Sequence, residues 1–157
     1  MCSSDLCCSQ LQHSQRKSTF LGVAIVQLCP QASPATQPTA ANHDAAMAWL
    51  AQWLPQQLRS PDTLARWQDH QLALALPGIQ DPAAWLHMTQ RLAQTLVEAQ
   101  QLCQPYGIQS LQLGCSCTLV PVGTAAELVE RACADLQPLP ASPPPTPANA
   151  AQIKENP

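Results

Sequence analysis

Residues 59–78 constrain the fold most, because a polar turn joins two short strands within them. Pro61 cannot continue a helix, so the preceding helix should end before it. Residues 72–76 then alternate leucine with alanine, which is the side-chain period of a strand. We predict a β-hairpin with its tip at residues 67–71, the leucines facing one side of a sheet and the alanines the other.

Hydrophobic periodicity predicts two elements before this hairpin. Residues 20–29 are apolar and β-branched, as in a buried central strand that ends at Pro30. Residues 44–58 repeat apolar side chains every three or four positions, which indicates a helix capped by Asn42 or Asp44. Pro55 should kink this helix or separate its last turn.

Two further helices have distinct start signals. Asp81 followed by proline predicts an N-cap, and the apolar face continues to about residue 104. Thr124 and Glu127 form a capping box that opens a helix to about residue 136. Residues 108–120 alternate apolar and polar side chains and should form a strand. The first six elements predict an α+β fold, a ferredoxin-like βαββαβ core with an antiparallel sheet and helices on one face.

Composition divides the chain into three parts. Residues 19–137 form the predicted domain, and 46% hydrophobic residues suffice to bury a core. Residues 1–18 are polar and without periodicity, so we expect a disordered segment or the end of a linker from a longer protein. Residues 138–157 are proline-rich, and we expect a tail that packs as no regular element and serves as a linker or an extended partner motif.

Charge and cysteine content exclude several classes of function. Charged residues make up only 11% and the net charge is −3, so a basic nucleic-acid surface is excluded and an anionic ligand must meet a few placed arginines. No apolar run is long enough for membrane insertion, and no export signal precedes the domain, so we expect a cytoplasmic protein with reduced cysteines. Cys115 and Cys117 lack zinc-knuckle spacing and should act as small core residues, although a metal or disulfide framework remains a minor alternative.

One spacing carries a family resemblance. Arg59 and Asp62 form an Arg-x-x-Asp motif, five residues follow it, and residues 68–72 read Gln-Asp-His-Gln-Leu. This pattern resembles GGDEF domains, the diguanylate cyclase fold, in which Arg-x-x-Asp stands five residues before the Gly-Gly-Asp/Glu-Glu-Phe hairpin. The resemblance covers about residues 20–136, and it implies a GGDEF-like fold whose upstream corner is intact and whose catalytic tip is not.

The resemblance also implies that catalysis has been lost. Active cyclases hold two metal ions through carboxylates, because Mg²⁺ takes hard oxygen ligands. The first-strand aspartate falls on Gln27, the hairpin's metal-binding acid on His70 and the glutamate after it on Gln71. Side chains at residues 68–69 replace the paired glycines that let backbone approach the phosphates. We therefore expect neither enzyme activity nor a metal or other cofactor.

Of the two guanine contacts that active cyclases make near the first helix, this sequence matches one and lacks the other. The asparagine that reads the base falls on Ala35, whereas Asp44 matches the aspartate that touches guanine. One such loss could be compensated, but the combined loss of metal ligands, glycines and base reader could not.

The retained corner matches the family's inhibitory site, which binds cyclic di-GMP. A guanidinium can fork onto guanine O6 and N7 or stack on the base, and a carboxylate can accept from N1–H and the 2-amino group. Arg59 and Asp62 fill these roles, Arg91 is the candidate for the family's second arginine within a one-residue shift, and Arg66 matches an arginine before the signature. An isolated Arg-x-x-Asp is, however, often only a local salt bridge.

The sequence thus leads to three hypotheses. The first is a cyclic di-GMP receptor that passes occupancy to a protein partner of a signalling or polysaccharide-secretion complex. Degenerate domains with this balance resemble the inhibitory-site-like domain of the cellulose-secretion regulator BcsE, and also receptor modules of composite signalling proteins; the residues do not separate the two. The second is a ligand-free scaffold or dimerisation domain. The third and weakest is an active cyclase or a GTP-binding allosteric domain.

Overall fold

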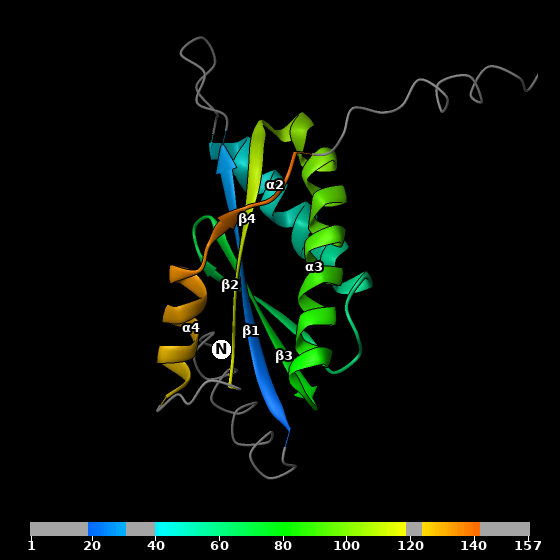
Figure 1. The fold of residues 1–157 in the computed structure, drawn as a ribbon. Helices are drawn as coiled ribbons and strands as arrows, with labels where there is room; N and C mark the ends of the chain where they lie inside the picture. The colour runs from blue at the N-terminus through cyan, green and yellow to red at the C-terminus, as the bar shows by residue number, and fades with distance from the viewer. Residues whose placement is uncertain (1–18, 31–39, 119–123, 142–157) are drawn as a thin grey trace, which may run out of the picture.

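The computed structural model describes residues 19–30, 40–118 and 124–141, which form an antiparallel sheet with helices on both faces (Figure 1). Its strands follow the order β2-β3-β1-β4-β5. Their bounds are β1 Phe20–Pro30, β2 Thr63–Gln68, β3 Gln71–Ile79, β4 Ile108–Cys117 and β5 Gln137–Pro138. The helices are α2 Ala40–Trp53, α3 Pro82–Cys103 and α4 Ala125–Ala134, with 3₁₀ turns η1 Leu54–Gln56 and η2 Gln104–Tyr106. The predicted α+β class and βαββαβ order are confirmed.

Strand β1 lies at the centre of this sheet, between β3 and β4, and both of its faces are covered. Alternate residues enter opposite cores: Ala24 and Val26 face the core under α2 and α3, whereas Val23 and Ile25 face the core under α4. This double burial explains why residues 20–29 are apolar without polar alternation. In β3 the leucines and alanines at 72–76 divide between the same two cores, as predicted.

Helices α2 and α3 cover one face, and Figure 1 shows α3 lying along the sheet. The apolar stripe predicted for α3 is the buried one: Leu92, Leu96 and Ala99 pack in the core. Asp81 caps α3 by accepting a hydrogen bond from the amide of Ala84 at 2.7 Å. The buried side chain of Gln100 accepts from the amide of Leu111 at 2.9 Å, which fixes α3 against β4. A buried amide with a satisfied partner adds specificity at little cost.

Helix α4 covers the opposite face, on the other side of the sheet from α3 (Figure 1). The prediction of helices on one face therefore holds for α2 and α3, and α4 closes the second core. The hydroxyl of Thr124 accepts from the amide of Glu127 at 3.2 Å, which confirms the predicted N-cap.

Two predicted boundaries are wrong. Helix α2 begins at Ala40, before both Asn42 and Asp44, so neither residue caps it. Alanines at 40 and 41 favour helix, so α2 starts before the polar residues that we expected to cap it. The hairpin turn is only Asp69 and His70, because β2 continues to Gln68. The predicted effect of Pro55 is confirmed: it lies in η1, which separates the last turn from α2.

Strand β5 was not predicted. Its two residues pair with Gln112 and Leu113 of β4, and Leu139 then donates its amide to the carbonyl of Leu111 at 3.0 Å and packs on the core. A proline is tolerated there because an edge strand leaves one side of its backbone unpaired. The start of the expected proline-rich tail is thus part of the sheet. Residues 1–18 and 142–157, where we predicted disorder, lie outside the described residues.

No helix in the described ranges combines the length and apolar character that a membrane span needs.

The contact between α4 and β4 gives a prediction about Gly114. A Cβ placed at Gly114 would overlap the backbone carbonyl of Ala132, which cannot move without shifting α4. We expect Gly114→Ala to lower the free energy of unfolding by about 1–3 kcal/mol, the range for overpacking a well-packed site. Urea denaturation followed by circular dichroism measures this change. Ser110→Ala, in the same strand, is the control, and equal stability of Gly114→Ala and the unmodified chain would contradict the contact.

Candidate functional site

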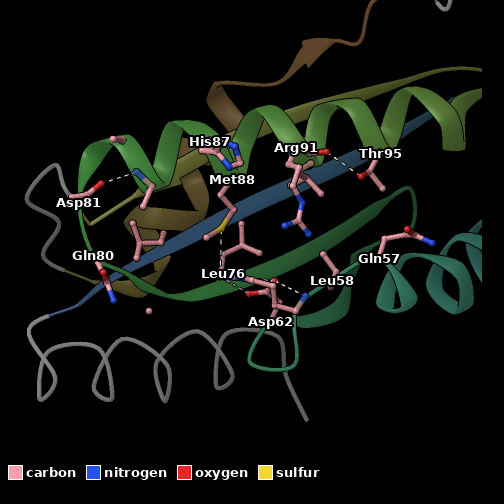
Figure 2. A pocket seen from close by; sticks show the side chains of 16 residues that line it. Gln57, Leu58, Asp62, Leu76, Gln80, Asp81, His87, Met88, Arg91 and Thr95 are labelled. Carbon is pink, nitrogen blue, oxygen red and sulfur yellow. Dashed lines mark hydrogen bonds and ion pairs between the residues drawn. The ribbon is translucent and has the colours of Figure 1, made fainter.

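A cleft of about 570 Å³ lies between α3 and the corner that joins η1 to β2 (Figure 2). Leucine and isoleucine side chains of β3 line it, while polar and charged groups come from the corner and from α3. Its main lining residues are Gln57, Leu58, Arg59, Asp62, Leu76, Ile79, His87, Met88, Arg91 and Thr95. The cleft therefore combines an apolar wall with a few polar groups, as small-molecule sites usually do.

Arg59 and Asp62 form a closed, bidentate ion pair at this corner. The guanidinium donates from Nε to Asp62 Oδ2 at 3.2 Å and from Nη2 to Oδ1 at 2.8 Å. The backbone repeats the link in both directions, since the Arg59 amide donates to Asp62 Oδ2 at 3.0 Å and the Asp62 amide donates to the Arg59 carbonyl at 2.9 Å. Pro61 between them suits such a turn. The corner is rigid because both side-chain and backbone hydrogen bonds join Arg59 to Asp62.

The two members of the pair differ in exposure. The Asp62 side chain is 3% exposed and both of its oxygens are engaged by Arg59, whereas the Arg59 side chain is 37% exposed. Arg59 Nη2 also lies 3.2 Å from the carbonyl of Pro77 and 3.6 Å from Met88 Sδ. Arg59 thus connects the corner to β3 and α3, and it is the member of the pair that reaches the cleft surface.

Arg91 reaches the same cleft from α3. Its side chain is exposed, and Figure 2 shows the guanidinium extending from the helix toward the side of the cleft that holds Leu58 and Asp62. The structure thus brings together three of the four predicted site residues, Arg59, Asp62 and Arg91, from segments about 30 residues apart.

Arg66 does not line this cleft. It lies on β2, where Nη2 is 3.5 Å from Asp44 Oδ1 and donates to the Asp69 carbonyl at 3.3 Å. The Arg66 and Asp44 side chains are 56% and 67% exposed, so this ion pair contributes little to stability. Arg66 therefore belongs to the hairpin, and not to the site around Arg59.

Sequence reasoning missed the other residues that α3 contributes to the cleft. His87 and Thr95 stand four positions before and after Arg91, on the same helix face, and Met88 lies beside them. Helical spacing of four could have found His87 and Thr95 once Arg91 was chosen. Gln57 carried no such signal, because its position depends on how η1 ends.

The hairpin end of the sheet holds neutral groups where the resemblance places metal-binding acids. Gln27 and Gln71 are paired across β1 and β3, and Gln71 Nε2 donates to Gln27 Oε1 at 2.8 Å. The amide of Leu28 donates to the carbonyl of His70 at 2.9 Å. In the part of the chain that the structure describes, no three His, Cys, Asp or Glu side chains are grouped so that they could hold a metal ion. Ala35 lies outside the described residues.

Two of the described cysteines, Cys103 and Cys115, are unsuited to nucleophilic chemistry. Burial raises the pKa of Cys103 to about 11, and burial together with the nearby carboxylate of Asp135 raises that of Cys115 to about 12. Because the thiolate is the reactive form, these thiols are inert near neutral pH. Cys117 is buried as well, in agreement with the prediction that Cys115 and Cys117 pack in the core.

No protein-family model matches the chain, and no curated protein matches its sequence. Solved structures do match it. The GGDEF domain of YfiN (TpbB) from Pseudomonas aeruginosa aligns over 83% of this chain and 82% of that chain, with TM-score 0.62 and 17% identity. A sensory box/GGDEF family protein from Caulobacter crescentus aligns over 85% and 86%, with TM-score 0.63 and 18% identity.

A third match is the GGDEF domain of DgcB from Caulobacter crescentus, whose structure is a complex with c-di-GMP. It aligns over 83% of this chain and 77% of that chain, with TM-score 0.57 and 15% identity. At these identities the similarity concerns the fold. The chain has the α+β fold of GGDEF domains.

Proposed function

We propose that this chain is a catalytically inactive GGDEF-like domain that binds cyclic di-GMP in the cleft between α3 and the Arg59 corner. The observation that carries this proposal is the meeting of Arg59 and Arg91 across one cleft with an apolar wall. A guanine base of cyclic di-GMP needs a flat apolar or cationic surface, and the ligand's phosphates need a cation. The cleft offers both within one cavity of ligand size.

The geometry suggests a separate role for each charged residue. Asp62 is buried and holds the Arg59 guanidinium by two hydrogen bonds, so it acts as a positioning residue. Arg59 then presents its exposed surface to a guanine edge or plane, and Arg91 approaches from the opposite wall to meet a phosphate or the second base. Because Asp62 already holds Arg59 in place, less conformational entropy is lost when the ligand binds.

The hairpin end supports the proposed lack of catalysis. Phosphoryl transfer from GTP depends on metal ions held by carboxylates. Gln27 and Gln71 are instead joined by one neutral hydrogen bond, from Gln71 Nε2 to Gln27 Oε1. Within this proposal the domain reports the level of cyclic di-GMP to a protein partner, and control of exopolysaccharide or cellulose production is the context that the degenerate pattern suggests.

One observation favours the second candidate, a ligand-free scaffold. The Arg59–Asp62 pair is complete without a ligand, and Arg59 also bonds to the Pro77 carbonyl, so a structural role alone could explain both residues. Arg91 distinguishes the two candidates, because it lies on the cleft and a scaffold would not require it.

Titration calorimetry with cyclic di-GMP tests the receptor proposal. We expect the unmodified chain to bind with a Kd of about 1 μM or tighter, which corresponds to roughly −8 kcal/mol or better. Arg59→Ala and Arg91→Ala should each weaken binding at least tenfold, because each removes a charged contact. Arg66→Ala is the matched control, since it removes an arginine outside the cleft, and its affinity should stay within about twofold.

A flat trace for the unmodified chain would contradict the receptor proposal and favour the scaffold. So would equal affinities for the unmodified chain and Arg91→Ala. Thermal unfolding of each variant shows whether a lost affinity reflects a lost fold.

Incubation with GTP and Mg²⁺ tests the proposed inactivity. We expect no cyclic di-GMP or pyrophosphate above a blank, because the described hairpin end offers glutamines in place of acids. Anion-exchange chromatography of the nucleotides provides the measurement, with an active diguanylate cyclase as the positive control. Product formed in proportion to the amount of chain would overturn this part of the proposal.

A further inference from the structure

His43 of α2 and His70 of the hairpin turn lie in direct contact. Their Nδ1 atoms are 3.3 Å apart, and the ring centroids are 4.1 Å apart with an edge-on orientation of 70°. His43 is 7% exposed, and its Nε2 is buried without a hydrogen-bond partner. His70 is exposed at the turn. The pair is therefore an asymmetric contact between a buried ring and an accessible one.

We propose that the His43–His70 contact is a proton-sensitive latch between α2 and the hairpin turn. The contact is closed when one of the two facing nitrogens carries a proton and the other does not, and it opens when both carry one. This inference is independent of cyclic di-GMP binding, because neither histidine lines the Arg59 cleft.

Hydrogen-bond chemistry gives the reason. Two nitrogens at 3.3 Å form a hydrogen bond only if one donates and the other accepts. When Nδ1 of the accessible His70 ring carries the proton, it donates to Nδ1 of His43. A second proton on His43 would place two N–H groups against each other and bury a charge, so the rings must separate.

The charged groups around His43 come from both packed elements. Burial is the largest influence and lowers the pKa of His43, and His70 lowers it further. Asp44 on α2 and Asp69 at the turn oppose this change, whereas Arg66 on β2 adds to it. The contact therefore persists at neutral pH and comes under strain on acidification. Since the pKa of folded His43 lies below its ordinary value near 6.5, the stability that it contributes is present above pH 6.5 and is lost as pH falls below it.

The hydrogen bonds between the hairpin turn and β1 do not depend on the His43–His70 contact. The turn is also held to β1 by the Gln27–Gln71 and Leu28–His70 hydrogen bonds, neither of which titrates. Opening of the latch would thus remove the buried contact between the turn and α2, while the exposed Arg66–Asp44 ion pair and the β1–β3 ladder remain. The region that changes is the end of the sheet that corresponds to the catalytic end of active GGDEF domains.

Imidazole nitrogen-15 NMR of the full chain, titrated from pH 8 downward with a chelator present, tests the latch. We expect a ring-to-ring Overhauser contact between His43 and His70 at pH 7.5 that disappears in the pH range where His43 takes up its proton. In His70→Gln the His43 midpoint should move upward, because one of the influences that lowers it has gone. His87→Gln is the control and should leave the His43 midpoint unchanged.

Stability provides the second measurement. Between pH 7.5 and 5.5 the unfolding equilibrium constant should rise at least threefold more in the unmodified chain than in His43→Gln. If His43→Gln does not fold, His70→Gln takes its place in this comparison. Three outcomes would overturn the latch: a ring contact that persists when both rings are protonated, a His43 that stays neutral until the chain unfolds, or a His43 midpoint unchanged in His70→Gln.

Discussion

The burial of β1 on both faces is the constraint on which this fold depends. A strand that is apolar on both faces must be covered on both. Helices α2 and α3 cover one face and α4 covers the other, with β3 and β4 as its neighbours. Gly114 shows how close this packing is, since no side chain fits between β4 and the α4 backbone. The Arg59 cleft and the His43–His70 contact both form where the helices meet the sheet.

The Arg59 cleft is one such consequence. Because α3 packs on the leucine face of β3, its N-terminal half lies opposite the corner where η1 passes into β2. The hydrogen bonds between Arg59 and Asp62 make this corner rigid, and Arg59 also contacts Pro77 of β3 and Met88 of α3. The same interaction therefore supports the fold and prepares the surface to which we assign ligand binding.

Much of the fold could be predicted from local signals. The Leu-Ala alternation at 72–76, the Asp81 cap and the Thr124 cap are each encoded within a few residues, and the structure contains all three. Strand β5 could not be predicted, because its pairing with β4 depends on where α4 ends and not on its own sequence. The start of α2 was misplaced because a polar cap signal was preferred to the helix propensity of two alanines.

The site was predictable in part. Arg59 and Asp62 were found from their spacing and Arg91 from a resemblance, and all three line one cleft. Arg66 was included because it matches an arginine before the signature of the family it resembles, but strand geometry directs it to Asp44. The burial of Asp62, which makes it a partner of Arg59, and the contact between His43 and His70 depend on tertiary packing. Residues 27 positions apart give no sequence signal for such a contact.

We propose that cyclic di-GMP binds in the Arg59 cleft and that the hairpin end is catalytically inactive. Chemical-shift mapping of the isotope-labelled chain with cyclic di-GMP tests it most directly. We predict saturable shifts at the Arg59 and Arg91 side-chain NH groups and at the Met88 methyl, with Gln27 and Gln71 unchanged. Shifts centred on Gln27 and Gln71, or none at saturating ligand, would contradict it.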